Sequence, residues 1–382
     1  MAHVLRGATA CVGVAHAGIG EAHGRNAMEL MVEAVHGALD DAKIPLSEVD
    51  GIFAASAFFA MAGMSLSEHL GIQPKFSDGS NIGGSSFMGH ALLAAMALEL
   101  GLCNVAVIAY GSNQRTAGGF RSISEPPPFE MVYGPRNPIT AYALAASRYM
   151  HQFGAKREDL AEVAVAARKW AQLNPEAFER GELTIDDVVN ARMISDPLGK
   201  LDCCLVTDGA AAIVMTRADR AKDCPNKPVH LLGCAMEHHH RMISAMPDLT
   251  VTAAAKSGPR AFEMAGCKAS DMDTVQLYDA FTINTILFLE DLGYCAKGEG
   301  KDFVGGGNIA PGGGLPVNTN GGGLSCVHPG MYGLFVMIEA IRQIRGNCGE
   351  RQIEGAKLGV AHGNGGVLSS QVTSVWGAPE TV

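Results

Sequence analysis

Short apolar runs alternate along the chain with longer segments of helical spacing. Residues 8–15 (ATACVGVA) and 104–110 (NVAVIAY) are almost entirely apolar, which is typical of strands buried on both faces. Apolar residues recur at helical spacing in residues 27–42, and residues 85–101 combine bulky apolar side chains with many Gly and Ala. The pattern predicts helices in these two segments, the second one buried on nearly all sides. A further strand is predicted at residues 209–216.

Residues 112–200 break this rhythm. They carry many charged residues and two amphipathic patterns, at residues 139–153 and 156–173, which predict two helices. Strand-like sequence resumes only at residue 209. The segment is therefore predicted to be a long insertion that lies over a core of strands and helices.

The second half of the chain repeats the first. Residues 42–52 align with residues 265–275, and Ala, Ser, an acid, an apolar residue, Asp and an aliphatic residue recur in the same order. The buried helix that ends at Gly101 resembles a later one that ends at Gly346, and each precedes a predicted strand, in the second case at residues 356–362. The two similarities occur in the same order, which indicates an internal duplication.

Two halves rich in βαβ units predict a duplicated α/β fold with helices on a mostly parallel sheet. The 382 residues are long enough for two domains. We expect an N-terminal half at residues 1–225, which includes the insertion at 112–200, and a C-terminal half at residues 226–382.

The composition favours a soluble, folded protein. Hydrophobic residues make up 47% of the chain and charged residues 18%, which allows a large core. The net charge of −10 argues against binding to nucleic acid or to an anionic membrane surface. The sequence has no apolar run of about 18 residues that would span a membrane and no apolar stretch of the kind found in signal peptides. We expect a cytoplasmic location.

The ten cysteines are scattered and show no C-x-x-C spacing. A structural zinc site in this chain is therefore not expected, and no other metal site is predicted. Scattered cysteines in a large chain are typical of a reduced, cytosolic protein.

Four segments carry polar residues where a strand or a glycine loop meets a predicted helix. Reacting groups in α/β proteins are commonly placed at such junctions. The segments are residues 78–86 (DGSNIGGSS), 278–281 (YDAF), 321–333 (GGGLSCVHPGMYG) and 362–366 (HGNGG).

The order and spacing of these segments, the duplication, and residues 201–212 (LDCCLVTDGAAA) resemble the thiolase superfamily over essentially the whole chain. The resemblance implies two similar α/β halves in five layers (αβαβα), with a helical loop region inserted in the first half. His-Pro-Gly after a glycine run is the most specific mark of the family. In thiolases that histidine holds the thioester carbonyl, and His328 is its counterpart.

The sequence departs from thiolases at both cysteines used in thiolase catalysis. Aligning Asn81 places Gly84 where thiolases carry the nucleophilic cysteine. His362 stands where they carry a second cysteine that acts as acid and base. Without a thiolate no acyl-enzyme forms, so acyl transfer through such an intermediate is not expected.

The Gly-Gly-Ser-Ser, Tyr-Asp-x-Phe and His-Pro-Gly-Met-Tyr-Gly segments more closely resemble thiolase-like aldolases of steroid side-chain degradation, of the lipid-transfer-protein type. This resemblance implies retro-aldol cleavage of a β-hydroxyacyl-CoA, with coenzyme A as part of the substrate and no tightly bound cofactor. It also implies at least a homodimer and a small partner subunit with an OB-fold and a zinc ribbon. Zinc is expected only in that partner.

A retro-aldol step requires a donor for the thioester enolate and a base for the β-hydroxyl group. We predict His328 as the donor. Tyr278 or Tyr332 would serve as the base if its pKa, normally about 10, is lowered or a relay is used. Asp279 or His362 is expected to orient the base or to relay the proton.

The residues expected to line the substrate are Gly84, Ser85, Asn364 and Gly365. Two other functions remain open at this point. One is a thiolase-type acyltransferase that cleaves a β-ketoacyl-CoA and whose nucleophile lies elsewhere, for which Cys326 is the cysteine inside a motif. The other is a thiolase-like subunit without catalytic activity that binds acyl-CoA.

Overall fold

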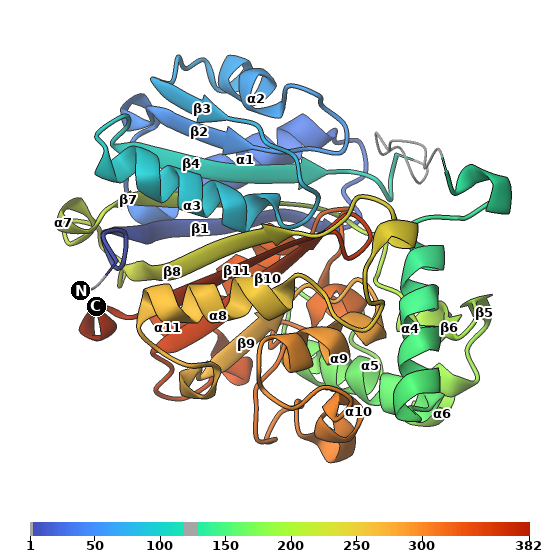
Figure 1. The fold of residues 1–382 in the computed structure, drawn as a ribbon. Helices are drawn as coiled ribbons and strands as arrows, with labels where there is room; N and C mark the ends of the chain where they lie inside the picture. The colour runs from blue at the N-terminus through green and yellow to red at the C-terminus, as the bar shows by residue number, and fades with distance from the viewer. Residues whose placement is uncertain (1–2, 118–128) are drawn as a thin grey trace.

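The computed structural model describes residues 3–117 and 129–382. Nine of its strands form one mixed sheet in the order β3-β2-β4-β7-β1-β8-β11-β10-β9 (Figure 1). The strands of one half of this sheet are β1 (Thr9–Gly20), β2 (Gly51–Ala54), β3 (Phe76–Asp78), β4 (Val105–Ser112) and β7 (Asp208–Arg217). The strands of the other half are β8 (Val229–His238), β9 (Thr274–Leu277), β10 (Leu358–Gly365) and β11 (Ser370–Gly377).

The two halves of the sheet follow the same plan from the centre outward. The central strands β1 and β8 pair with each other through two residue pairs only. Each is followed by an antiparallel strand, β7 or β11, and then by β4 or β10. The next strand, β2 or β9, runs parallel to its neighbour. A parallel bridge between Val275 and Val317 stands where the first half has β3. This arrangement is the duplication that the sequence predicts. The expectation of a mostly parallel sheet is wrong, because the inner strands from β4 to β10 pair antiparallel and only the outer pairs are parallel.

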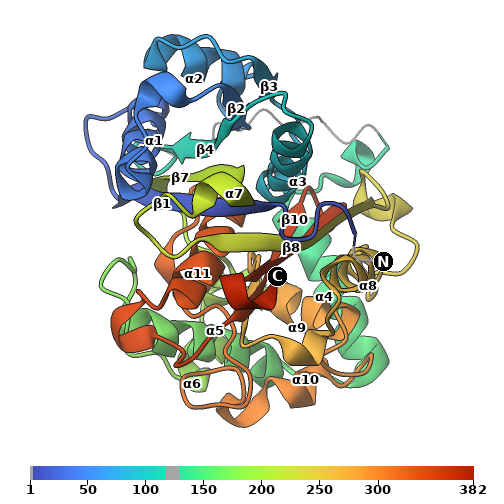
Figure 2. The same cartoon turned by 90° about the vertical axis from the view of Figure 1, so that its left-hand side faces the viewer.

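Helices divide the molecule into layers. Helix α1 (Ala27–Ala42) packs on β1, β4 and β7, and α2 (Ala62–Leu70) packs beside it. Helices α3 (Ser86–Glu99) and α11 (Gly333–Arg345) contact each other and strands of both halves. Helix α8 (Ala254–Ala265) covers β8 and β11. Figure 2 shows α1 and α3 on opposite sides of β4, and α8 and α11 on opposite sides of β8. Helix, first half of the sheet, helix pair, second half of the sheet and helix follow one another, which gives the five layers implied by the resemblance.

The aligned segments of the two halves occupy matching positions. Helix α1 ends at Ala42 and β2 begins at Gly51, whereas α8 ends at Ala265 and β9 begins at Thr274. A single 3-10 turn lies between helix and strand in both cases. Helices α3 and α11 precede β4 and β10, as predicted.

Helix α3 is buried along most of its length. Its Phe87, Met88 and Ala91 are fully buried, and so is Gly89. Small residues at several of its positions allow strands from both halves to approach the helix closely. Its position at the centre of the molecule places its first turn, and the motif residues there, against both halves.

The insertion folds into the helices predicted for it. These are α4 (Ile139–Phe153), α5 (Arg157–Gln172) and the short α6 (Ile185–Val189), followed by the two-stranded β5 (Met193–Ser195) and β6 (Leu198–Gly199). Helices α4 and α5 pack against α9 (Thr282–Asp291), and α5 also against the short α10 (Gly300–Phe303) (Figure 1). The part of the insertion at residues 118–128 lies outside the described residues. The predicted boundary at residue 225 falls between α7 (Ala218–Ala221) and β8, and it stays a prediction.

Candidate active site

The four motif segments converge around the first turn of α3. The turn at Gly84 lies against the ring of Tyr278 and against the backbone of residue 364, since a Cβ on Gly84 would stand 2.0 Å from Tyr278 Cε2 and 2.8 Å from the Asn364 carbonyl oxygen. The start of α11 reaches the same turn, because a Cβ on Gly333 would stand 2.0 Å from the Gly84 oxygen. Segments far apart in sequence therefore meet at one place.

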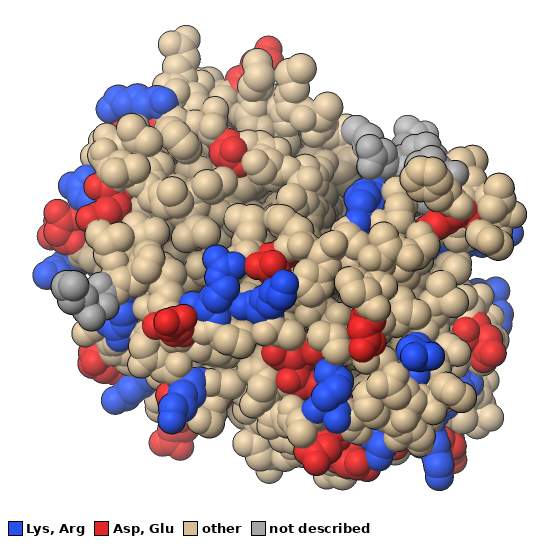
Figure 3. Space-filling view, viewed as in Figure 1, with Lys and Arg blue, Asp and Glu red and all other residues tan. Residues whose placement is uncertain are grey.

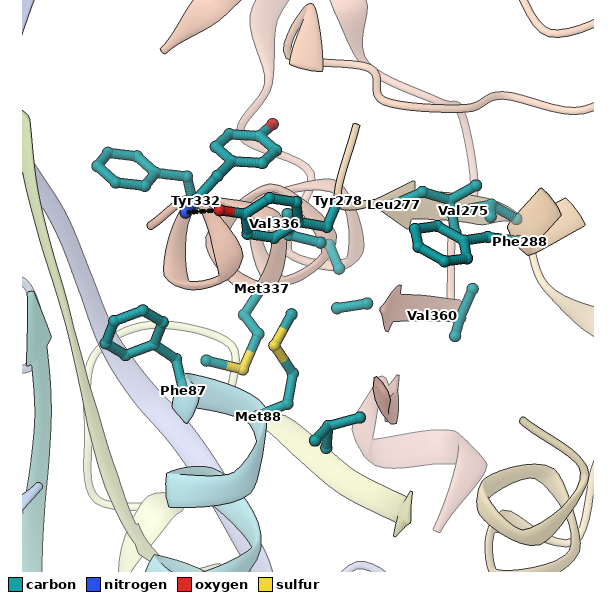
Figure 4. Close-up of a cluster of buried hydrophobic side chains, with 14 of the residues drawn as sticks. Phe87, Met88, Val275, Leu277, Tyr278, Phe288, Tyr332, Val336, Met337 and Val360 are labelled. Carbon is teal, nitrogen blue, oxygen red and sulfur yellow. Dashed lines mark hydrogen bonds between the residues drawn. The ribbon is translucent and has the colours of Figure 1, made fainter. Parts of the chain in front are cut away.

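The hydroxyl of Tyr278 is the centre of a group of three predicted site residues. It lies 3.1 Å from His328 Nε2 and accepts a hydrogen bond of 3.1 Å from the main-chain N–H of Tyr332. The Tyr278 ring meets the rings of His328 and Tyr332 edge to face, with centroids 5.5 and 5.7 Å apart. Figure 4 shows the hydrogen bond between Tyr332 and Tyr278, with the hydroxyl of Tyr332 pointing away from it.

The main chain of His328 is held from two sides. Its N–H donates to the hydroxyl of Thr207, and its carbonyl accepts from the side-chain amide of Gln114 at 2.9 Å. Burial lowers the pKa of His328 from 6.5 to about 4, although a hydrogen bond with its own main-chain carbonyl opposes this shift. The imidazole is therefore neutral at pH 7. Its Nε2 faces the Tyr278 hydroxyl at 3.1 Å, and a neutral imidazole can exchange a proton with a hydroxyl at this distance.

Burial raises the pKa of Tyr278 and of Tyr332 well above 10. Both hydroxyls are protonated at neutral pH, so neither tyrosine is a ready anion. The hydroxyl of Tyr332 donates to Asn320 Oδ1 at 2.9 Å, which keeps it apart from the Tyr278 hydroxyl. The expectation that a tyrosine pKa is lowered therefore does not hold, and a relay through His328 is the alternative that the geometry offers.

Asp279 lies behind this group rather than in it. Its carboxylate accepts the N–H groups of Gly323, at 2.6 Å, and of Leu324, at 3.4 Å, in the turn at Gly322–Cys326. Burial raises the pKa of Asp279 to about 7, which the hydrogen bond from Gly323 opposes. Gly322 adopts a left-handed conformation with φ 65°, and a Cβ there would stand 2.0 Å from the Asp279 carboxylate. Asp279 thus fixes the turn that leads to His328.

The side chain of His362 faces another part of the molecule. It lies against Phe288, with ring centroids 4.6 Å apart, and its nitrogens are 2.9 Å from the Thr373 hydroxyl and the Gln371 amide oxygen. Burial lowers its pKa from 6.5 to about 4. The structure therefore does not bring His362 into the group around Tyr278. Its main-chain carbonyl does contact that segment, because it accepts the N–H of Tyr278.

The four residues expected to line the substrate lie at the convergence point with little solvent access. The Ser85 hydroxyl is fully buried and lies 2.8 Å from that of Ser370. Asn364 is 2% exposed and donates to the hydroxyl of Tyr142 at 2.7 Å. Gly84 and Gly365 allow close packing of main chain. Their role in substrate binding stays a prediction.

Comparison with known proteins assigns the chain to a family. Residues 235–378 match the family described as Thiolase C-terminal domain-like. A steroid side-chain-cleaving aldolase of Thermomonospora curvata is 33% identical over 366 residues, covering 90% of this chain and 92% of the relative. A 17-hydroxy-3-oxo-4-pregnene-20-carboxyl-CoA lyase of Mycobacterium tuberculosis is 34% identical over 364 residues, covering 90% and 93%. This chain belongs to the thiolase superfamily.

A solved structure of the Ltp2-ChsH2(DUF35) aldolase superposes on the chain with a TM-score of 0.90 at 32% identity, and covers 98% of this chain and 99% of that one. The predicted thiolase fold is confirmed, and so is the resemblance to thiolase-like aldolases. Within the described residues, no helix combines the length and apolar character needed to cross a membrane.

The structure shows why residue 84 is a glycine rather than a cysteine. The space that a nucleophilic cysteine side chain would need at this position is filled by the ring of Tyr278, 2.0 Å from an added Cβ. Cys326, the other candidate nucleophile, is 2% exposed, and burial raises the pKa of its thiol far above 9. The described part of the chain also contains no group of three or more His, Cys, Asp and Glu residues that could hold a metal ion.

Three further residues hold the site and were not found from the sequence. The hydroxyl of Tyr110, at the end of β4, donates to the Pro329 carbonyl and accepts from the N–H of Met331, and so fixes the His-Pro-Gly turn. Gln114 holds the His328 carbonyl. Tyr142 reaches the site from the insertion. For Tyr110 a signal existed, since a tyrosine ends the otherwise apolar run at residues 104–110.

A cavity of about 570 Å³ opens between the insertion and the turn at Gly322–Cys326. Its walls include Arg115, Arg168 and Lys200, together with Cys204 and Leu324. Arg168 is 8% exposed and donates to the uncharged Ser325 hydroxyl and Gly181 carbonyl. Burial lowers the pKa of Arg168, although Glu179 opposes this. Three cationic side chains and the carboxylate of Glu179 thus line a cavity beside the turn held by Asp279, and one of the cations, Arg115, is paired with Glu21.

Proposed function

We propose that this protein cleaves a carbon–carbon bond of a β-hydroxyacyl-CoA by retro-aldol chemistry. The observation that carries the proposal is that the buried Tyr278 ring, hydrogen-bonded to His328, fills the space beside Gly84, the position that the resemblance aligns with the thiolase nucleophile. A tyrosine–histidine pair can move a proton but cannot form a thioester. The names of the relatives, an aldolase and a CoA-thioester lyase that share a third of their residues with this chain, support the same reaction class.

The proposed proton path starts with the Tyr278 hydroxyl and the His328 imidazole both uncharged. The substrate β-hydroxyl gives its proton to the Tyr278 oxygen while Tyr278 passes its own proton to His328 Nε2, 3.1 Å away. The Cβ–O bond becomes a carbonyl, the Cα–Cβ bond breaks, and its electron pair forms the thioester enolate. The imidazolium stabilises the enolate, whose charge raises the pKa of His328 as the proton arrives. Return of the proton through Tyr278 to Cα releases a ketone or aldehyde and an acyl-CoA.

The remaining predicted residues support this path. Tyr332 donates its main-chain N–H to Tyr278 and stabilises negative charge on that oxygen, while its hydroxyl stays with Asn320. Asp279 orders the turn before His328. We propose that Gly84, Ser85, Asn364 and Gly365 shape the wall against which the acyl group lies. His362 is not placed on the proton path.

We further propose that coenzyme A, as part of the substrate, enters through the cavity lined by Arg115, Arg168 and Lys200. Phosphate groups are met best by such cations. Leu324, which lines this cavity, also donates its N–H to Asp279, so the cavity adjoins the turn that carries His328. No tightly bound cofactor is part of the proposal.

The proposal includes an assembly of at least two copies. The edge strand β3 is three residues long and partly exposed, and an uncovered edge favours pairing with another chain. Apolar side chains stand out on the neighbouring α2 and at the end of α3, namely Met61, Met64, Met96, Leu100 and Leu102. Charged side chains are few on the upper part of the face in Figure 3, over these elements, and frequent on its lower part. We therefore place the contact of a homodimer there.

A partner subunit with an OB-fold and a zinc ribbon belongs to the same proposal. The solved relative is named as an Ltp2-ChsH2(DUF35) aldolase, a name that joins two proteins. All ten cysteines are unpaired, which supports a reducing, cytoplasmic location.

The test of the proposed function is product analysis with a β-hydroxyacyl-CoA, with and without a DUF35-type partner. A ketone or aldehyde plus an acyl-CoA is the expected outcome. Tyr278→Phe should lose about 10²–10⁴-fold in kcat, and His328→Ala about 10²-fold or more. Tyr332→Phe should lose less, because its main-chain N–H remains. Two CoA thioesters as products would establish the thiolase-type alternative, and binding without turnover would establish the silent subunit.

A further inference from the structure

A continuous chain of hydrogen bonds runs through the interior from the second half of the molecule to helix α4 of the insertion. Its six side chains are each at most 2% exposed, and the bonds between neighbours measure 2.7–2.9 Å. The last bond, 3.3 Å long, reaches a main-chain carbonyl in the 362–366 segment. In order, the members are Ser257, Thr373, His362, Gln371, Asn364, Tyr142 and the carbonyl of Gly366.

The carbonyl at one end sets the direction of every bond. Gly366 O can only accept, so the Tyr142 hydroxyl donates to it and accepts from the Asn364 amide. The Asn364 oxygen then accepts from the Gln371 amide, whose own oxygen faces His362 Nε2. His362 must therefore carry its hydrogen on Nε2.

The same direction occupies the second nitrogen of His362. With the hydrogen on Nε2, Nδ1 accepts from the hydroxyl of Thr373, which in turn accepts from Ser257. The ring is fully buried, and burial favours its neutral form. A proton acceptor for the substrate requires a free lone pair, and the chain leaves none on this imidazole. The His362 side chain is therefore better suited to hold its neighbours in place than to act as a base.

The end of the chain holds the wall behind Tyr278. Tyr142 belongs to α4 of the insertion, and its ring packs on Phe281 of the 278–281 segment at 4.4 Å. Its hydroxyl binds the loop at residues 364–366, whose backbone lies against the turn at residues 82–84. The Tyr278 ring rests on that turn at Gly84. A shift of the loop would therefore move the ring that carries the reacting hydroxyl.

We propose that Tyr142 is a positioning residue for Tyr278, and that His362 acts as the polar link that keeps Tyr142 and the 364–366 loop in place. The activity tests rest on the proposed function. The hydrogen-bond chain itself is tested without any substrate, so failure of one is distinguishable from failure of the other.

The first test reads the tautomer of His362 in the full chain. Two-dimensional ¹H–¹⁵N spectra of protein labelled at the histidine ring nitrogens, assigned with His362→Gln, should show a neutral ring with its hydrogen on Nε2 between pH 6 and pH 9. A hydrogen on Nδ1, or a charged ring at pH 6, would overturn the chain whatever the activity is.

The second test compares two replacements of His362. His362→Gln keeps an amide that can still donate to Gln371, and should stay within about two-fold of wild type in kcat. His362→Leu removes both hydrogen bonds and should lower kcat about 10-fold with little change in KM. A loss of about 10²–10⁴-fold in both variants would make His362 a base and overturn the proposal.

Tyr142→Phe should match His362→Leu, and the double variant should be no worse than either single one, because both break the same chain. Tyr149→Phe is the matched control: it removes a buried hydroxyl from the same helix, but one that binds Glu290. Melting temperatures exclude unfolding. A Tyr142→Phe enzyme as active as the control, or multiplicative losses in the double variant, would overturn the positioning role. If wild type cleaves no β-hydroxyacyl-CoA, the proposed function fails. The spectra then still show whether the hydrogen-bond chain through His362 has the proposed direction.

Discussion

The substitution Gly84→Ala tests the central feature of the site with one added methyl group. The new Cβ would stand 2.0 Å from Tyr278 Cε2, 2.6 Å from Tyr278 Cζ and 2.8 Å from the Asn364 oxygen. Gly84 is not among the glycines with positive φ, so alanine brings no backbone strain of its own. The effect of the change is therefore steric, and it falls mainly on the Tyr278 ring and to a smaller extent on the Asn364 carbonyl.

The magnitude follows from contact distances. Carbon atoms pack at about 3.5–4.0 Å, so the Tyr278 ring would have to recede by roughly 1.5 Å. Overpacking of this kind costs about 1–3 kcal/mol in the free energy of unfolding. Such a displacement also breaks the 3.1 Å contacts of the Tyr278 hydroxyl with His328 and the Tyr332 N–H. A shift of about 1 Å at a reacting group can cost about 10²-fold in rate, so we expect at least that loss in kcat/KM.

The assay combines urea unfolding with turnover and uses Gly89→Ala as the control. Gly89 lies in the same helix, and a Cβ there would meet its nearest atoms at 3.7 Å, so this variant should be as stable as wild type or slightly more stable. In a Tyr278→Ala background, Gly84→Ala should cost less than in wild type, because the methyl group enters the space that the ring has left and only the 2.8 Å contact with the Asn364 oxygen remains. Normal turnover and normal stability of the single Gly84→Ala variant would refute the assignment of Tyr278 to this space.

Three further outcomes are expected. Burial lowers the pKa of His90 from 6.5 to about 4, so its contribution to stability is complete above pH 6.5 and is lost as the pH falls toward 4. His90→Leu should reduce the slope of unfolding free energy against pH in this window by about 1.4 kcal/mol per pH unit, and an unchanged slope contradicts it. Iodoacetamide should leave turnover intact, whereas loss that follows modification of Cys326 would restore the thiolase interpretation. Light scattering of the chain alone should show a dimer with little activity, and a fully active monomer would exclude the assembly.

The sequence predicted the fold best where a segment is buried on both sides. The runs at residues 104–110 and 209–216 lie within β4 and β7, and the aligned residues 42–52 and 265–275 hold matching positions in the two halves. The sequence analysis did not identify β8, β11 or α8. Helix α8 contains Pro259, and its buried residues recur at helical spacing but are mostly small, namely Ala254, Ser257, Gly258, Ala261, Phe262 and Ala265. An internal proline and a buried face with one bulky side chain make such a helix hard to predict from hydrophobic periodicity.

The site residues also fall into those that the sequence could predict and those that it could not. The four motif segments, and with them Tyr278, His328 and Tyr332, could be found from residue types next to glycine turns. Their mutual geometry could not, because it depends on strand order and on the close packing of glycines. Tyr142 shows why: it lies in an amphipathic helix of the insertion, where an apolar face accounts for a tyrosine, and only the folded chain brings its hydroxyl to Asn364. The resemblance placed His362 by its position along the chain, but the pleat of β10 turns its ring toward Phe288.

Relative to thiolases, the glycine at residue 84 and the tyrosine at residue 278 depend on each other and are best understood as a single change. In the sequence, Gly84 signals only that a nucleophile is missing, which would suit a subunit that has lost its activity. In the fold, the glycine is what allows a tyrosine ring to occupy that space, with its hydroxyl 3.1 Å from His328 Nε2. A subunit without catalytic function could fill the same space with any apolar side chain, and burying a hydroxyl there would carry a desolvation cost. A buried hydroxyl that contacts both a histidine nitrogen and a main-chain N–H therefore favours an enzyme with a different mechanism over a subunit without activity.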